Sequence, residues 1–132
     1  MSKDNLRSKL FSSRNQRKKL VKIEADGEQI EVEVRQPSIE VRTRIGKVSK
    51  VDSSGEARDI EAIEQGRLIA VVECSFDPET GEKLFAMSDR DSLFKQAAWY
   101  DQLANECLSM LRYSPGAAEE AEKNSETTQS AN

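Results

Sequence analysis

The chain has 132 residues, of which 36% are hydrophobic and 33% are charged, and its formal net charge is −4. This length and composition predict one compact domain with polar ends. The absence of histidine excludes His-based catalytic triads and imidazole metal ligands. No apolar run approaches the roughly 18 residues of a membrane helix, and the first residues lack the apolar core of a signal peptide, so we expect a soluble, intracellular protein.

Positive charge is concentrated at the amino terminus. Residues 1–22 contain eight lysine and arginine side chains, and Asp4 is their single acidic residue. The rest of the chain is therefore acidic. A basic arm on an acidic body can fold against its own domain, bind an acidic partner or contact nucleic acid.

Within this arm, residues 3–11 predict a short amphipathic helix. Leu6, Leu10 and Phe11 lie on one side of it. Nine residues are too few for a stable isolated helix. We therefore expect residues 1–18 to form a basic, flexible arm whose short helix docks on its own domain, docks on a partner or stays disordered.

A β-hairpin is the first strongly predicted element after the arm. Asp26 and Gly27 separate two β-favouring runs, and this dipeptide is typical of a type I′ turn, which needs positive φ at both central positions. Apolar and polar residues alternate after the turn, which predicts one buried and one exposed face. The apolar residues of the two runs are Leu20, Val21 and Ile23, and Ile30, Val32 and Val34. Helices must cover this face, because a lone two-stranded ribbon is marginally stable.

Two helices are predicted next. Pro37 ends the second strand, since proline cannot donate to a strand ladder but is tolerated in the first turn of a helix. A helix is expected from about residue 38 to residue 51. Residues 58–75 repeat apolar side chains at helical spacing and predict a second, buried helix. The β-branched run 69–72 leaves a strand as the alternative there.

The longest predicted helix runs from about residue 88 to residue 113. Ser88 and Asp91 have the spacing of a capping box at its start. Trp99 falls off the main apolar stripe, so a partner contact is an alternative to core packing for its side chain. The stripe itself is broad, which indicates more than one packing neighbour, and comprises Leu93, Phe94, Ala97, Tyr100, Leu103, Ala104, Cys107, Leu108, Met110 and Leu111.

The carboxyl-terminal residues 114–132 contain no large apolar side chain and are predicted to be a disordered polar tail. The fold class is therefore α+β, with an N-terminal β-hairpin packed on about three helices. The single domain is expected to comprise residues 19–113.

No group of residues predicts a reaction. The segment 77–88 superficially resembles a calcium loop, but Ser88 stands where the bidentate glutamate belongs. The glycines are dispersed and form no phosphate-binding motif. Cys74 and Cys107 are expected to be buried free thiols rather than a disulfide or a metal site. We expect a protein that is not an enzyme, with no catalytic residue, metal or cofactor.

The order of three segments resembles the tail assembly chaperones of long-tailed bacteriophages. The segments are VEVRQPSIEVRTRI, LIAVVECSFDPETGEKLFAMSD and, after a terminal helix, AAEEAEKNSE. Their most characteristic pieces are residues 34–38, which follow a hairpin strand, and residues 77–82, which precede Phe85 and Asp89. The similarity covers roughly residues 20–126.

The resemblance implies a role in virion assembly in the host bacterial cytoplasm. Such chaperones are thought to coat the long, aggregation-prone tape measure protein and to recruit tail tube subunits around it. Many are made in two forms by a translational frameshift, and the longer form would contact the tail tube protein. The family has no catalytic residues, and homo-oligomerisation is left open.

Five apolar residues are the predicted partner contacts: Leu6, Leu10 and Phe11 on the arm, and Trp99 and Leu103 on the last helix. A broad apolar stripe on a small domain can hold another protein's helices. The alternative function is a nucleic-acid-binding adaptor or regulatory protein that uses the basic arm. That alternative is less favoured, because the arm lacks interleaved aromatic residues for base stacking.

Overall fold

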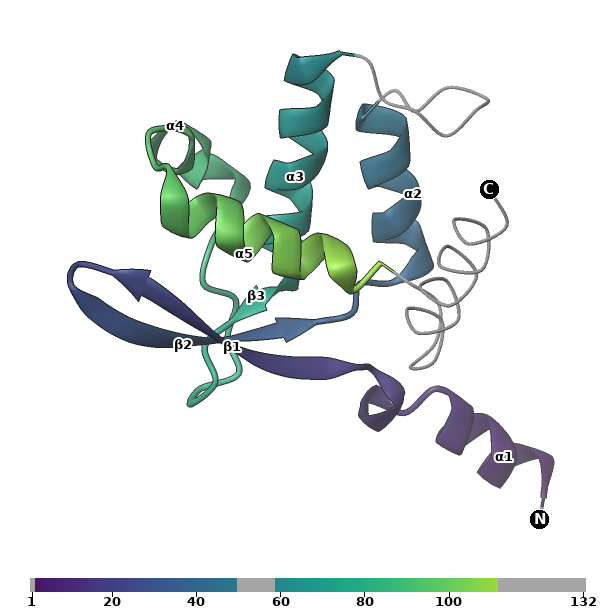
Figure 1. The fold of residues 1–132 in the computed structure, drawn as a ribbon. Coiled ribbons are helices and arrows are strands. Elements are labelled where there is room, and N and C mark those ends of the chain that lie inside the picture. Colours follow the sequence, from purple (N-terminus) through teal and green to yellow (C-terminus); the bar gives the residue numbers. More distant parts are fainter. Residues whose placement is uncertain (1, 50–58, 112–132) are drawn as a thin grey trace, which may run out of the picture.

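The computed structural model describes residues 2–49 and 59–111, and it confirms the predicted α+β class. The predicted tail, residues 114–132, lies outside the described residues. The elements are α1 (Lys3–Leu10), η1 (Ser13–Asn15), β1 (Lys18–Ala25), β2 (Glu28–Arg35), α2 (Ile39–Val48), α3 (Ile60–Cys74), β3 (Ser75–Phe76), η2 (Met87–Asp89), α4 (Arg90–Phe94) and α5 (Ala98–Ser109). In Figure 1, α5 lies across the hairpin, α3 rises from the sheet and α2 packs along α3.

The hairpin forms as predicted. Asp26 and Gly27 have φ values of 53° and 72°, the two positive values that a type I′ turn requires. β1 pairs with β2 in antiparallel register, with Val21 opposite Val32. Because partners across an antiparallel pair point to the same face, Val21, Ile23, Val32 and Val34 form one buried surface under α5. The prediction is wrong for Leu20, which lies opposite Glu33 on the other face and is 60% exposed.

A third strand extends this sheet and was not predicted. β3 pairs with the outer side of β2, so the strand order is β1-β2-β3. It has two residues and follows α3 directly, without a turn residue between them. Two residues are too few to show the alternation by which a strand is recognised in a sequence.

α3 is the centre of the hydrophobic core. The helix begins after Asp59, whose side chain accepts a hydrogen bond from the Ala62 backbone N–H at 3.2 Å. Its second half, from Leu68, is buried nearly all round, because α2 and α5 both pack against it. This confirms the predicted helix and excludes the strand alternative at residues 69–72.

The prediction of one long helix from residue 88 to residue 113 is wrong. The segment forms η2, α4 and α5, and the backbone breaks at Ala97, where φ is −135° and ψ is −97°. The predicted capping box at Ser88 is absent: the Asp89 carboxylate instead accepts the Ala86 backbone N–H at 2.9 Å. The broad apolar stripe therefore belongs to two helices in different directions, and α3 is the longest helix described.

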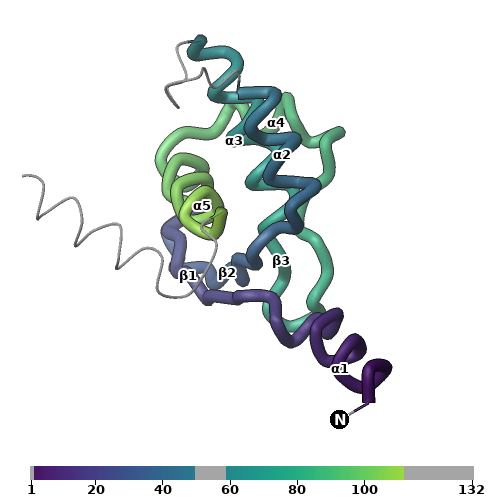
Figure 2. The backbone as a smooth tube through the Cα atoms, turned by 90° about the vertical axis from the view of Figure 1, so that its right-hand side faces the viewer, coloured from purple at the N-terminus to yellow at the C-terminus, as the bar shows by residue number. Residues whose placement is uncertain are grey.

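The arm begins with the short helix that the sequence predicts. Ser2 caps α1 by accepting a hydrogen bond from the Asn5 N–H at 3.3 Å. The side-chain amide of Asn15 donates to the carbonyl oxygens of Lys9 and Leu10, at 2.7 and 2.9 Å, and so closes the end of α1. No residue of α1 is buried, and the helix stands away from the domain in both Figure 1 and Figure 2.

The close contact of α2 and α3 depends on Gly66 and gives a testable prediction. A Cβ atom at Gly66 would lie 2.0 Å from Ser49 Oγ, whereas a Cβ atom at Gly46 meets nothing within 4 Å. Alanine is favoured over glycine inside a helix by about 0.5–1 kcal/mol. We expect Gly46→Ala to raise the free energy of unfolding by that amount, and Gly66→Ala to lower it by about 1 kcal/mol. Urea unfolding measures both, and equal stabilisation by the two variants would contradict the close approach.

Candidate functional site

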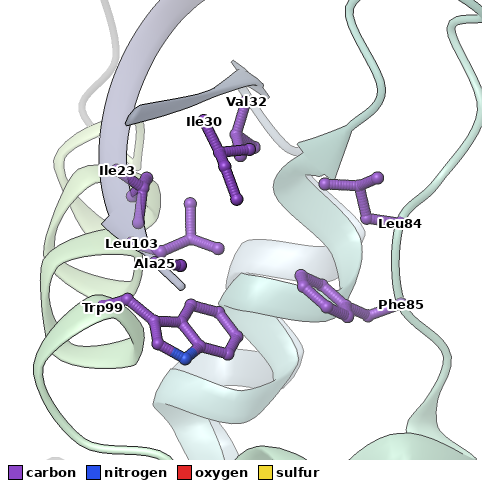
Figure 3. A pocket seen from close by; sticks show the side chains of 8 residues that line it. All are labelled: Ile23, Ala25, Ile30, Val32, Leu84, Phe85, Trp99 and Leu103. Atoms are coloured by element: carbon purple, nitrogen blue, oxygen red, sulfur yellow. The ribbon is translucent and has the colours of Figure 1, made fainter. Parts of the chain in front are cut away.

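An apolar hollow lies between the turn end of the hairpin, the Leu84–Phe85 segment and the first half of α5. Its volume is about 200 Å³. Figure 3 shows the Trp99 and Phe85 rings on one side of the hollow and hairpin residues on the other. No charged side chain lines it; the lining residues are Ile23, Ala25, Ile30, Val32, Leu84, Phe85, Trp99 and Leu103.

The two aromatic rings are held in place by their neighbours. The ring centroids of Phe85 and Trp99 are 6.2 Å apart, with an interplanar angle of 24°. The indole N–H of Trp99 donates to Gln96 Oε1 at 3.1 Å, so its polar atom is satisfied within the chain. The half-buried Trp99 side chain therefore presents mainly apolar ring surface to the hollow.

A turn before Phe85 positions that side of the hollow. Asp77 Oδ1 accepts the Glu79 backbone N–H at 2.8 Å, and Gly81 takes a φ of 76°, a left-handed conformation that glycine adopts without strain. The Leu84 backbone N–H then donates to the Ser75 carbonyl oxygen at 3.1 Å. The turn thus returns the chain to the sheet edge and directs Leu84 and Phe85 toward α5.

A second hollow, of about 340 Å³, adjoins the first and shares Leu84, Phe85 and Trp99 with it. The remaining residues of this second hollow are Asp89, Ser92, Leu93 and Gln96. We call the two hollows together the Phe85–Trp99 groove. Large side chains at its mouth are partly exposed: Leu84 is 40% exposed and Ile30 is 42% exposed. The groove therefore offers apolar surface to a partner of helical or extended form.

The groove is lined by one charged side chain. Asp89 is the single charged residue among those that line its two hollows. Glu28 pairs with Ala25 across the hairpin and so projects from the same face.

The predicted contact residues occupy two separate places. Leu6, Leu10 and Phe11 of α1 are 52%, 66% and 75% exposed. Trp99 and Leu103 lie in the groove, and Leu103, at 1% exposure, forms its floor. The structure does not bring the two sets together: α1 precedes the first residue of β1, whereas the groove lies at the turn end of the hairpin (Figure 1).

The sequence did not reveal that Ile30, Leu84 and Phe85 belong to the groove. Ile30 was assigned to the buried face of the hairpin. Their positions near the hairpin turn and the Asp77–Gly81 turn were the available signal, because side chains next to turns often remain partly uncovered.

Glu73 links three parts of the fold beside the groove. Its carboxylate lies 2.9 Å from Arg44 of α2 and 2.7 Å from Lys83 of the segment that precedes Phe85. Partial burial alone would raise the pKa of Glu73. The hydrogen bonds from Lys83 and Arg44 together outweigh burial and hold this pKa below its ordinary value of 4.5.

This network predicts a pH-dependent contribution to stability. A carboxyl whose pKa is lowered by folding stabilises the native state at pH values above its ordinary pKa. This contribution to stability disappears as the pH falls through the lowered pKa. We expect Glu73→Gln to lower the free energy of unfolding by about 1 kcal/mol at neutral pH. The difference from wild type should vanish below the lowered pKa. Urea unfolding at pH values from neutral to below the lowered pKa tests this expectation, with Glu79→Gln at an exposed residue as the control. A loss of unfolding free energy that is independent of pH would contradict the ion-pair explanation.

The two cysteines are free and buried, as predicted. Ser75 Oγ lies 3.5 Å from Cys107 Sγ. A hydrogen bond with Cys107 and burial both raise the pKa of Cys74, so this thiol is protonated at neutral pH. The residues that the structure describes contain no group of three or more side chains that could hold a metal ion. No helix among them is long and apolar enough to cross a membrane.

Comparison with solved structures finds a similar chain of known role. The tail assembly chaperone of bacteriophage HK97 aligns over 83% of this chain and 99% of its own length, with a TM-score of 0.57 and 17% sequence identity. The fold resembles that of the HK97 tail assembly chaperone. No known family model and no curated protein sequence matches the chain.

The extent of the match is informative. Because nearly all of the HK97 tail assembly chaperone is covered, the two chains share the arrangement of a whole domain rather than one common motif. At 17% identity the likeness establishes the fold alone.

Proposed function

We propose that this chain is a bacteriophage tail assembly chaperone. It binds the tape measure protein, keeps it soluble in the host bacterial cytoplasm and helps to recruit tail tube subunits. The observation that carries the proposal is the match of fold over 99% of the HK97 tail assembly chaperone. The order of the three sequence segments that resemble the family also supports it.

The exposed apolar surfaces are suited to this role. A chaperone of this kind must offer apolar contacts to a client that would otherwise aggregate, while its charged faces keep the complex in solution. The Phe85–Trp99 groove and the α1 side chains Leu6, Leu10 and Phe11 supply such contacts. Leu103 acts from the groove floor by shaping the hollow beside Trp99. No chemical step is required of any residue.

A second, longer form is part of the proposal. A frameshifted product would continue beyond the sequence of this chain and would make the main contact with the tail tube protein. The short form would then act on the tape measure protein alone. Mass spectrometry of the products made from the phage's own gene, with its downstream frame intact, identifies the longer form by peptides from both frames.

Co-purification tests the proposed function. The tagged full chain is mixed with the tape measure protein of the same phage at about 0.15 M and at about 1 M salt. Apolar contact predicts that the client is retained at both concentrations. Binding of double-stranded DNA that falls steeply as salt rises, together with no retention of the tape measure protein, would instead favour the nucleic-acid adaptor.

A further inference from the structure

The amino-terminal arm is strongly basic, and the described part of the chain neutralises little of its charge. Residues 3–19 carry seven lysine and arginine side chains, and Asp4 is their single acidic residue. Lys19 forms an ion pair with Glu106 of α5. A cluster of like charges attracts a segment of opposite sign. Four cations of the arm are exposed and have no acidic partner among the residues that the structure describes: Lys3, Lys9, Arg14 and Lys18.

The last residues of the sequence carry the opposite charge and follow a point that lies beside the arm. Residues 114–132 contain four glutamates, at positions 119, 120, 122 and 126, against Lys123 alone. The described chain ends at Leu111, whose carbonyl oxygen accepts a hydrogen bond from Arg42 Nη1 at 3.3 Å. The ion pair of Glu106 with Lys19 holds the last part of α5 against the start of β1, where the arm leaves the domain. Figure 1 shows α5 ending on the side of the molecule where α1 lies.

The length of chain after Leu111 is sufficient to reach the arm. Glu119 follows Leu111 by eight residues, which can span up to about 26 Å. Leu111 is already close to the start of β1, and α1 is only about 12 Å long. A tether of this length holds the glutamates at an effective concentration on the order of 1 mM around the arm. The chain's own acidic segment therefore competes well with dilute acidic partners.

We propose that the acidic segment, residues 114–132, binds the basic arm of its own chain and shields the arm from nucleic acid. An exposed group of cations binds polyanions without regard to sequence, because it displaces their counterions. The acidic segment contains no large apolar side chain, so it occupies the charges of the arm and leaves Leu6, Leu10 and Phe11 uncovered. The arm then discriminates against polyanions while its apolar side stays open to a protein client.

Carbodiimide cross-linking of the full chain tests the contact, because this reagent joins carboxylates to amines that touch them. At about 0.1 M salt, mass spectrometry should find the glutamates of the acidic segment joined to Lys9 and Lys18 at least about tenfold more often than to Lys95. Lys95 is the matched control, because it is exposed and lies near the start of α5, about 18 Å from the end of that helix. The Lys19–Glu106 pair should cross-link in every sample.

Two further conditions make this experiment decisive. The excess over Lys95 should vanish at about 1 M salt, because salt screens charge attraction. In a mixture of isotope-labelled and unlabelled chains, the cross-links should join peptides that carry the same label. Cross-linking to Lys95 at the same frequency as to the arm, or cross-links mainly between different labels, would overturn the proposal.

Binding of a fluorescent DNA duplex at about 0.1 M salt tests the shielding. A variant whose acidic segment has no net charge should bind the duplex at least about fivefold more tightly, because its arm is uncovered. This variant carries Glu119→Gln, Glu120→Gln and Glu122→Gln. The matched control changes the net charge equally at exposed residues near the hairpin turn and at the start of α3: Glu24→Gln, Glu28→Gln and Glu61→Gln.

The control should change the affinity for DNA less than about twofold, because charges farther apart than the Debye length of about 10 Å are largely screened. Equal effects of the two variants, or no effect of the first, would overturn the shielding. Neither measurement uses the tape measure protein, so the proposed chaperone function can stand or fall without this result.

Discussion

Leu68→Ala is expected to lower the free energy of unfolding by about 3–5 kcal/mol. Leu68 is fully buried in α3, the helix against which both α2 and α5 pack. Removing three carbon atoms there leaves a cavity that two neighbouring helices cannot both close. Total stability of a small domain is only about 5–15 kcal/mol, so the variant should unfold at a much lower urea concentration.

Urea unfolding followed by circular dichroism measures this loss. Ile60→Ala is the matched control, because Ile60 lies in the same helix and is 77% exposed. It should change the free energy of unfolding by less than about 0.5 kcal/mol. Equal effects of the two substitutions would contradict the placement of α3 at the centre of the core.

The second large effect is expected on client binding. In the co-purification experiment, Leu10→Asp with Phe11→Asp should reduce the retained tape measure protein at least about tenfold, because two exposed apolar contacts are replaced by charges. Folding should be unaffected, since neither residue is buried. Ile39→Asp, which introduces a charge at an equally exposed apolar residue outside α1, should retain the client. Undiminished retention by the arm variant would remove α1 from the client contact.

Leu84→Arg tests the groove in the same experiment. If the groove contacts the client in addition to α1, Leu84→Arg should retain less client than the wild type although its arm is intact. Wild-type retention by Leu84→Arg would remove the groove from the client contact.

Local signals were sufficient to predict the hairpin and the first two helices after it. The dipeptide Asp26-Gly27 allows one common turn type, and Ser38 caps α2 by accepting the Val41 backbone N–H at 3.3 Å. The apolar spacing of residues 58–75 was strong enough to outweigh the β-branched run within it. Each of these elements is specified mainly by residues within its own segment.

The break before α5 and the strand β3 depend on distant parts of the chain. No glycine or proline marks the break at Ala97, and the apolar stripe continues across it. The direction of α5 is favoured by packing on α3 and on the hairpin. β3 forms because β2 presents an open edge where α3 ends. Neither cause has a signature within the segment itself.

The candidate site was predicted only in part for the same reason. Trp99 was singled out because it falls off the helical stripe, and it does line the groove. The opposite wall comes from the hairpin and from the segment after Gly81, which only the folded chain brings together. Leu103 is covered by the hairpin and by the segment after Gly81. Its position in the apolar stripe therefore could not reveal that it forms the floor of the Phe85–Trp99 groove.

The soluble yield of the tape measure protein is the most direct measurement of the central claim, that exposed apolar surface on this chain shields a client. The tape measure protein is expressed alone, with the wild-type chain, and with the variant that carries both the α1 substitutions and Leu84→Arg. Most of the client is predicted to be soluble with the wild type and insoluble in the other two cases. A client that is equally soluble with and without the wild-type chain would contradict the account.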